Sequence, residues 1–285
     1  MSLLLPVVTS GSVRLLMSKH NDPNKTALPL EPLPDGLDMH SPLMQVLVSV
    51  LDKLQARHSY QVHGIEHIPE GRCLIVVNHS LATYDVMLLM LTIFERLGRL
   101  PRGLGDRRLF QLPGLSQLVS SLGGVLASQG GGERLLEDGL LVVVAPGGMK
   151  EALRTKEQRY QVRWEDRKGF ARLAVRTGAP LVMAACPKAD DLYDVVDSDL
   201  TRRVYDQFRL PLPLFRGVGP GGLIPRPVHL SHTLSEPIYP PAVDTDEGTI
   251  FDSAVDKLHG ACTDVMTELL RSGVSTGSDG ATESN

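Results

Sequence analysis

Three short runs of apolar residues place the strongest limit on how this chain can fold. They extend from Cys73 to Val77, from Leu140 to Ala145 and from Pro180 to Cys186. Continuous apolar runs of this length, bounded by turn residues, are typical of strands buried on both faces of a parallel sheet. A helical segment from Lys168 to Thr177, closed by Gly178, lies between two of them. The alternation predicts an α/β fold with a central, mostly parallel sheet flanked by helices.

The remaining segments fill out one predicted domain. Helices are expected over 43–54, from 85 onward, and over 112–122, 133–137 and 250–270; strands are expected over 60–65, 102–105, 123–128 and within 228–238. Residues 1–42 form an N-terminal extension with a Pro-rich linker, residues 43–271 the single domain, and residues 272–285 a Ser/Thr/Gly-rich tail expected to be disordered. The apolar stripe of 43–54 allows core packing or contact with a membrane, and core packing is favoured.

Composition excludes several classes of protein. The chain has 285 residues, a net charge of −4 and a pI of about 6.1, which argues against a nucleic-acid partner. Its three cysteines are widely spaced and predict no disulfide framework, so a reducing compartment is expected. No apolar run reaches the roughly 18 residues of a spanning helix, so any contact with a membrane is expected at its surface.

A histidine and an aspartate follow the first aliphatic run. Asn78 and His79 end the predicted strand, and Asp85 lies in the first turn of the next predicted helix. Ligands of open α/β sheets bind at the carboxyl ends of strands. A histidine with a nearby carboxylate is suited to remove a proton from a hydroxyl group that attacks a carbonyl. The alternative is a structural histidine at a strand end, which is the more common role of this pair of residue types.

A glycine-rich segment follows the second aliphatic run. It extends from Pro146 to Glu151 and contains Gly147, Gly148 and Lys150. Two glycines allow backbone N–H groups to approach a phosphate or a developing oxyanion closely. A plain turn is the alternative that the Pro-Gly-Gly sequence also favours.

Together these segments resemble the glycerolipid acyltransferase (PlsC-like) superfamily. The matching blocks, in the family's order, are 78–85, 105–114, 146–152, 168–174 and 178–182, and the resemblance covers about residues 60–240. Two features differ from the branch that forms phosphatidic acid. Five residues separate His79 from Asp85 where that branch usually has four, and Gly147-Gly148-Met149-Lys150 replaces Glu-Gly-Thr-Arg. The third block is closer to the neutral-lipid branch, which includes diacylglycerol acyltransferase-2-like enzymes and transmembrane protein 68.

The resemblance implies an acyltransferase domain over residues 43–271 and an O-acyltransferase activity. The donor would be acyl-CoA or acyl carrier protein, and the acceptor a mono- or diacylglycerol, a lysophospholipid or a long-chain alcohol. It implies His79 as general base and Asp85 as the carboxylate that orients it. The substrate-binding residues would be Gly147, Gly148, Lys150, Glu151, Arg107 and Arg108. For Arg107 and Arg108, which would contact the CoA phosphates, a solvated surface pair is the alternative. Glu151 would either pair with Lys150 or a nearby arginine, or hold the acceptor hydroxyl. No metal and no cofactor beyond the co-substrate are expected, and the protein is expected to be cytoplasmic and peripherally bound to a membrane surface.

Two other functions remain open at this stage. The same His79 and Asp85 would let an esterase or thioesterase activate water, and a non-catalytic lipid-binding relative would need neither residue. The segment Gly217–Gly222 fits a G-x-G-x-x-G pattern but contains Pro220 and opens no predicted helix, so a dinucleotide site is not expected. The histidines at 58, 63 and 67 are expected at the surface, and Trp164 is expected to pack in the core.

Overall fold

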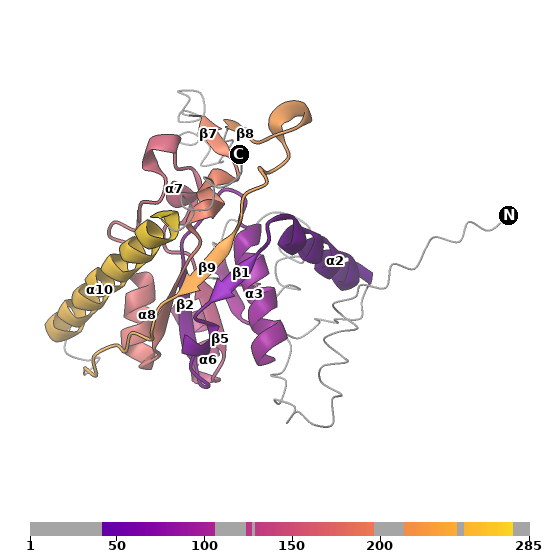
Figure 1. The fold of residues 1–285 in the computed structure, drawn as a ribbon. Helices are drawn as coiled ribbons and strands as arrows, with labels where there is room; N and C mark the ends of the chain where they lie inside the picture. The colour runs from indigo at the N-terminus through magenta and orange to yellow at the C-terminus, as the bar shows by residue number, and fades with distance from the viewer. Residues whose placement is uncertain (1–41, 106–123, 127–128, 197–213, 244–247, 276–285) are drawn as a thin grey trace.

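A seven-stranded sheet forms the centre of the protein (Figure 1). The computed structural model describes residues 42–105, 124–126, 129–196, 214–243 and 248–275. The strands, in sheet order, are β1 (Gln61–His63), β9 (Ser231–Leu234), β6 (Leu181–Ala185), β2 (Cys73–Val77), β5 (Leu141–Val144), β3 (Arg102–Gly105) and β4 (Gly124–Leu126). A separate pair of strands, β7 (Asp194–Val196) and β8 (Leu214–Arg216), forms a small antiparallel ribbon.

The predicted α/β class and mostly parallel sheet are confirmed. The five strands from β6 to β4 are parallel, whereas β9 joins β6 in antiparallel orientation and β1 runs parallel to β9. All residues of β2 and β6 are buried, as expected for central strands covered on both faces. The three aliphatic runs are thus adjacent strands, in the order β6-β2-β5.

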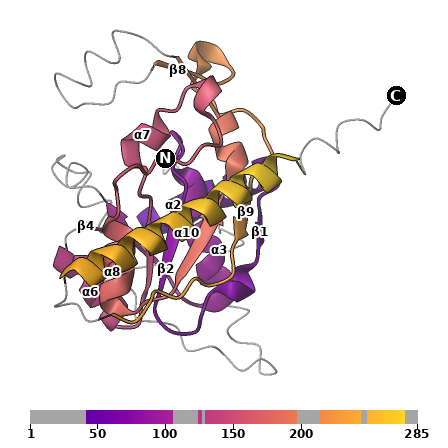
Figure 2. The same ribbon diagram turned by 90° about the vertical axis from the view of Figure 1, so that its left-hand side faces the viewer.

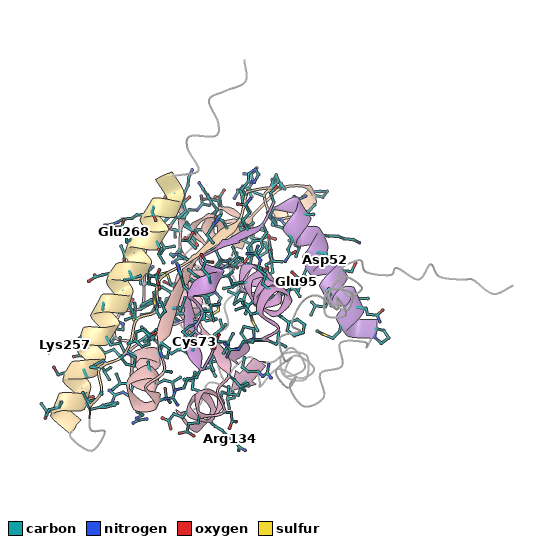
Figure 3. All side chains as sticks on the ribbon, turned by 60° about the horizontal axis from the view of Figure 1, so that its bottom comes forward. Asp52, Cys73, Glu95, Arg134, Lys257 and Glu268 are labelled. Atoms are coloured by element: carbon teal, nitrogen blue, oxygen red, sulfur yellow. The ribbon has the colours of Figure 1, made fainter. Side chains whose placement is uncertain are left out.

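Helices cover both faces of the sheet. They are α2 (Pro42–Arg57), α3 (Tyr84–Leu97), α6 (Gln129–Glu137), α7 (Gly148–Ala152), α8 (Gly169–Thr177) and α10 (Gly248–Ser275). Leu74 and Val76 of β2 pack in one core cluster with residues of α6, α8 and α10. Cys73, Ile75 and Val77 pack on the opposite side, in a cluster that contains residues of α3. Figure 2 shows α10 crossing in front of the sheet, and Figure 3 shows Cys73 between α10 and α2.

Most of the predicted elements that fall on described residues are present. Helix α2 packs Val48 and Leu51 into buried positions, which supports core packing, while Val46 and Val50 remain exposed. Helix α10 extends to Ser275, beyond position 272, where the tail was expected to begin. The predicted helix over 112–122 and the residues Arg107 and Arg108 lie outside the described residues. Among the described helices, none combines the length and the apolar character that a bilayer-spanning segment requires.

The fold brings three loops to one edge of the sheet. Because β2, β5 and β6 are adjacent and parallel, the segments that follow them begin at the same edge. These segments are residues 78–83, the start of α7, and the 3-10 helix η3 (Pro187–Asp191). The candidate site is built from these three segments.

Candidate active site

His79 occupies the position directly after Asn78 at the carboxyl end of β2. Its side chain is partly exposed, whereas its neighbours Asn78 and Ser80 are buried. The ring Nδ1 lies 2.8 Å from the Ser80 carbonyl oxygen. A carbonyl oxygen only accepts hydrogen bonds, so Nδ1 carries the proton and donates it. The Nε2 atom is therefore the nitrogen with a free lone pair, and it is able to accept a proton from a hydroxyl group.

Asp85 is connected to His79 through Ser80. The Ser80 hydroxyl donates to Asp85 Oδ1 over 2.7 Å, and no hydrogen bond between described residues joins the His79 ring to the Asp85 carboxylate. Asp85 is completely buried in the first turn of α3, and its Oδ2 atom has no partner among the described residues. Burial raises the pKa of Asp85 to about 6, against the smaller opposing effect of the Ser80 hydrogen bond. The predicted orienting role of Asp85 remains a prediction, and in this structure its effect would pass through Ser80.

Two buried charged residues, Glu151 and Arg154, hold the backbone of His79. The His79 N–H donates to Glu151 Oε2 over 3.0 Å, and Arg154 donates to the His79 carbonyl oxygen over 3.0 Å. Arg154 also donates to Asp190 Oδ1 over 2.7 Å and lies 3.4 Å from Glu151 Oε1. We call Glu151, Arg154 and Asp190 the backbone clamp. The clamp fixes the position of the His79 peptide, which begins the candidate catalytic motif.

The clamp is an almost completely buried ionic group. Each of its three side chains is at most about one-twentieth exposed. Burial raises the pKa of Glu151 and of Asp190, while the Arg154 guanidinium opposes both shifts. Further donors satisfy the carboxylates, because the Arg163 N–H binds Glu151 Oε1 and the Tyr160 N–H binds Asp190 Oδ2. Such a group is held in place by its geometry, and removing one member leaves the others unpaired in the interior.

Burial also affects the candidate base. The pKa of His79 is lowered by burial, and the nearby Arg154 charge lowers it further, against the opposing hydrogen bond to Ser80. The ring therefore stays neutral at neutral pH. A neutral imidazole is the form that can act as a general base.

The glycine-rich segment turns at Pro146 and Gly147 and then begins α7 at Gly148. A side chain at Gly147 would overlap the Glu151 carboxyl group, so this position must be glycine for the clamp to form. Gly148 has φ of 48°, in the left-handed region that favours glycine. Arg167 donates to the carbonyl oxygens of Pro146 and Gly147. The backbone of this segment is thus held by an arginine that the sequence analysis did not identify.

Lys150 pairs with Glu165 at the surface rather than with a residue of the clamp. Its Nζ atom lies 2.5 Å from Glu165 Oε2, and both side chains are about half exposed. Of the alternatives predicted for Glu151, the structure shows pairing with a nearby arginine, Arg154. Lys150 thus lies at the surface in an ion pair with Glu165.

Within the described residues, one set of metal-ligating side chains has its donor atoms close together. Asp85, Cys186 and His232 are buried, and one donor atom of each lies within 4.8 Å of the others. His232 Nδ1 lies 2.8 Å from the Tyr60 hydroxyl, and Asn78 holds the backbone of Cys186 through both its side-chain atoms. Three donors are one fewer than a closed structural zinc site has. We assign this set no role in the reaction.

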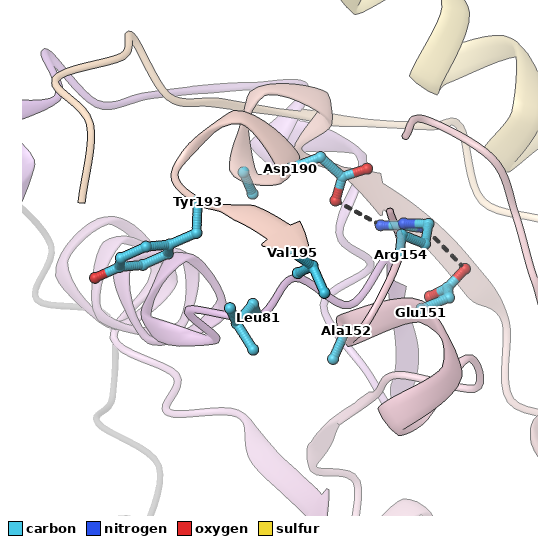
Figure 4. Close-up of a pocket in the computed structure, with 8 residues that line it drawn as sticks. Leu81, Glu151, Ala152, Arg154, Asp190, Tyr193 and Val195 are labelled. Atoms are coloured by element: carbon cyan, nitrogen blue, oxygen red, sulfur yellow. Dashed lines mark hydrogen bonds and ion pairs between the residues drawn. The ribbon is translucent and has the colours of Figure 1, made fainter. Parts of the chain in front are cut away.

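A small pocket adjoins the clamp (Figure 4). It is lined by Leu81, Glu151, Ala152, Arg154, Ala189, Asp190, Tyr193 and Val195. Its volume of about 10 Å³ is close to the space needed by one water molecule, so it does not hold an acyl chain. The pocket places Leu81, two residues after His79, beside Tyr193 and Val195 at the start of the ribbon of β7 and β8.

Arg154, Asp190 and Ser80 were not among the residues predicted from the sequence. Arg154 carried a signal, since it lies three positions after Glu151, where side chains meet on one helix face. Asp190 comes after the carboxyl end of the buried strand β6, just as His79 comes after that of β2. This shared position could have been recognised in the sequence. The prediction that His58 lies at the surface was wrong. It is buried, with Nδ1 2.8 Å from the Val228 carbonyl oxygen and Nε2 2.8 Å from the Tyr84 hydroxyl.

Comparison with known proteins identifies relatives of this chain. Residues 59–186 match the protein-family model described as Acyltransferase. The chain is 33% identical over 193 residues to a mouse protein described as "DGAT1/2-independent enzyme synthesizing storage lipids", covering 67% of this chain and 56% of that protein. It is 32% identical over 184 residues to a Mycobacterium tuberculosis protein described as uncharacterized, covering 62% of this chain and 51% of that protein. The chain thus spans about half the length of these curated relatives.

One solved structure with a detectable likeness is the 1-acyl-sn-glycerophosphate acyltransferase PlsC from Thermotoga maritima. It aligns with a TM-score of 0.41 at 16% sequence identity, over 76% of this chain and 80% of that chain.

Proposed function

Residues 59–186 of this chain belong to the acyltransferase family, and from this premise we propose that the protein moves a fatty acyl group from a thioester to a lipid hydroxyl. The donor is acyl-CoA or acyl carrier protein. The acceptor is a mono- or diacylglycerol, a lysophospholipid or a long-chain alcohol. A neutral-lipid product is supported by the mouse relative, whose description is that of an enzyme synthesizing storage lipids. An acceptor of this kind resides in a membrane, so the protein works at a membrane surface.

The observation that carries the proposal is the state of the His79 ring. Its Nδ1 proton is bound to the Ser80 carbonyl oxygen, its pKa is lowered, and its side chain is partly exposed at the edge of the sheet where ligands bind. A base in this state is ready to accept a proton from an acceptor hydroxyl at Nε2. The backbone clamp fixes the peptide of His79 while the ring acts.

The reaction has two steps. In the first, Nε2 of His79 takes the hydroxyl proton while the hydroxyl oxygen forms a bond to the thioester carbonyl carbon, whose oxygen becomes negatively charged. In the second, the carbonyl re-forms, the carbon–sulfur bond breaks, and the thiolate takes the proton back from the imidazolium. Asp85, acting through Ser80, stabilises the imidazolium during both steps. The products are an ester and a free thiol, so no external oxidant or reductant is needed.

Surface cations would bind the donor. Lys150 would exchange Glu165 for a donor phosphate, with the backbone at Gly147 and Gly148 beside it. Arg107 and Arg108, which lie outside the described residues, are proposed as further phosphate contacts.

The test is acyl transfer from labelled acyl-CoA to a panel of lysophosphatidate, monoacylglycerol, diacylglycerol and long-chain alcohols, with products identified by mass. We expect His79→Ala to lower turnover by about 100- to 10,000-fold, the usual contribution of a general base. Its matched control is His229→Ala, which removes an exposed histidine and should leave turnover unchanged. Near-normal transfer by folded His79→Ala would refute the mechanism.

The same assay separates transfer from hydrolysis. Free thiol is measured with and without each acceptor. If thiol release does not depend on any acceptor and only free fatty acid forms, the protein is an esterase or thioesterase that uses His79 to activate water.

A further inference from the structure

We infer that residues 215–224, which we call the tip loop, dock the protein on a bilayer and insert apolar side chains into its interface. The inference rests on the proposed function, because it specifies how the active site meets a lipid acceptor. The loop begins with the last two residues of β8 and projects from the molecule at the end where α7 lies, in both Figure 1 and Figure 2.

The tip loop exposes an unusual amount of apolar surface. Leu223 is 67% exposed and Ile224 44% exposed, and Phe215 and Val218 are also exposed. Four large apolar side chains within ten residues of a surface loop form a local cluster, whereas single exposed apolar residues need no explanation. Removing this surface from water would stabilise any state in which the loop is covered.

The loop pairs several of its own backbone polar groups, which lowers the cost of placing it in an apolar environment. Val218 and Ile224 exchange two backbone hydrogen bonds, of 2.8 and 3.2 Å, and the Gly217 N–H donates to the Gly222 carbonyl oxygen over 2.7 Å. Gly217 must be glycine for this closure, since a side chain there would overlap the Ile224 carbonyl group. Backbone groups left unpaired in lipid are costly. A loop closed on itself in this way exposes fewer of them.

The charge of the segment indicates a lipid rather than a basic partner. Residues 214–228 contain no aspartate or glutamate and include Arg216 and Arg226. Arg226 is bound to Asp194 at the base of the ribbon, whereas Arg216 is exposed beside the apolar cluster. Apolar residues flanked by an exposed cation fit a membrane interface that contains anionic phospholipid.

Tyr193 connects the tip loop to the active site. Its hydroxyl donates to the Leu223 carbonyl oxygen over 3.0 Å, and its ring packs against Phe215 at a centroid distance of 5.0 Å. The same Tyr193 lines the small pocket with Leu81, which lies two residues after His79. Docking the loop would therefore place the membrane surface near the catalytic motif.

The experiment measures binding of the full chain to vesicles by co-sedimentation. Two compositions are used, phosphatidylcholine alone and phosphatidylcholine with phosphatidylglycerol. Leu223→Ser combined with Ile224→Ser should weaken binding to both by about tenfold or more. Arg216→Gln should weaken binding only to the anionic vesicles.

The matched control is Ile250→Ser, which makes the same change at a residue 53% exposed in the first turn of α10. It should bind vesicles like the unchanged chain. A second measurement uses the variant Leu223→Trp, whose added tryptophan should be quenched by brominated phospholipid. The chain's other tryptophan, Trp164, is buried and should not be quenched. The inference would be overturned if the double variant bound vesicles as well as the unchanged chain, or if Leu223→Trp showed no quenching. It would also be overturned if the double variant changed its oligomeric state without losing vesicle binding.

A failure of the proposed acyl transfer can be distinguished from a failure of the docking inference. Acyl transfer to a short, monomeric alcohol in solution does not require docking. The double variant should retain this activity and lose transfer to an acceptor embedded in vesicles. If the unchanged chain binds vesicles through the loop but transfers to neither acceptor, the docking inference stands and the proposed reaction fails.

Discussion

At the scale of single residues, the candidate base is defined by its backbone as much as by its ring. Ser80 fixes the ring tautomer through its carbonyl oxygen, and Glu151 and Arg154 hold the N–H and C=O groups of His79 itself. The position of Nε2 then depends on a buried ionic group more than on the side chain of Asp85. Exact placement of a base matters because proton transfer occurs only within hydrogen-bond reach of the acceptor hydroxyl.

The first prediction concerns Glu151→Gln. Both Glu151 oxygens accept backbone N–H groups, so an amide there must turn its NH₂ group toward one of the two donors. Arg154 also loses one of its two anionic partners. We expect urea unfolding to show a loss of about 2–4 kcal/mol and turnover to fall with it.

Its matched control is Glu165→Gln, which removes a glutamate paired with Lys150 at the surface. Because that pair is about half exposed and screened by water, the free energy of unfolding should hardly change. Equal losses in the two variants would show that the clamp is not a special feature of the site.

At the scale of elements, the central strands were predictable, whereas the long-range contacts that close the clamp were not. β2, β5 and β6 are buried on both faces, so their sequences carry almost no polar residues to confuse the pattern. His58 was misplaced because its partners, Val228 and Tyr84, are 170 and 26 residues away along the chain. Local patterns cannot show such contacts, and the same holds for the bond between Arg154 and Asp190.

At the glycine-rich element, the structure shows a steric reason for glycine that the sequence does not reveal. Sequence analysis expected Gly147 to admit a phosphate or an oxyanion. The structure shows in addition that a side chain at this position would collide with Glu151. A glycine-rich pattern indicates that another group approaches the backbone closely. It does not show whether that group is a ligand or a side chain of the protein itself.

The second prediction tests this element with Gly147→Ala. The new methyl group must displace the Glu151 carboxyl group, which breaks its bond to the His79 N–H. We expect a loss of about 1–3 kcal/mol in the free energy of unfolding and a lower kcat. The comparison is Gly260→Ala on the exposed side of α10, where nothing lies within 4 Å of the added atom. That change should stabilise the protein by about 0.5–1 kcal/mol, and destabilisation by both changes to the same extent would contradict the argument.

At the scale of the whole molecule, the site lies at a junction of buried titratable groups. Asp85 and His232 are both fully buried, and donor atoms of the two lie within 4.8 Å of each other. Burial shifts their pKa values in opposite directions, raising that of Asp85 to about 6 and lowering that of His232 to about 3. Each group is thereby held neutral over a pH range in which it would be charged in the unfolded chain.

The last prediction follows from the sign of these shifts. The pKa of Asp85 is raised from its ordinary 3.8 to about 6 in the folded protein. The stabilisation that the neutral carboxyl group contributes is therefore complete below pH 3.8 and is lost as pH rises through about 6. The pKa of His232 is lowered from its ordinary 6.5 to about 3 in the folded protein. The stabilisation that the neutral imidazole contributes is therefore complete above pH 6.5 and is lost as pH falls toward 3. The two residues therefore have opposite effects on the pH dependence of stability, and single substitutions should separate them.

The measurement is urea unfolding from about pH 8 to about pH 5 for the unchanged chain, Asp85→Asn and His232→Gln. Relative to Asp85→Asn, the unchanged chain should gain stability on acidification, because the folded carboxyl group takes up a proton before the unfolded one does. Relative to His232→Gln, it should lose about 2 kcal/mol between about pH 6.5 and about pH 5, since only the unfolded histidine is protonated there. Parallel curves for all three proteins would mean that neither group is held neutral by burial, and the environment described here for the catalytic motif would be wrong.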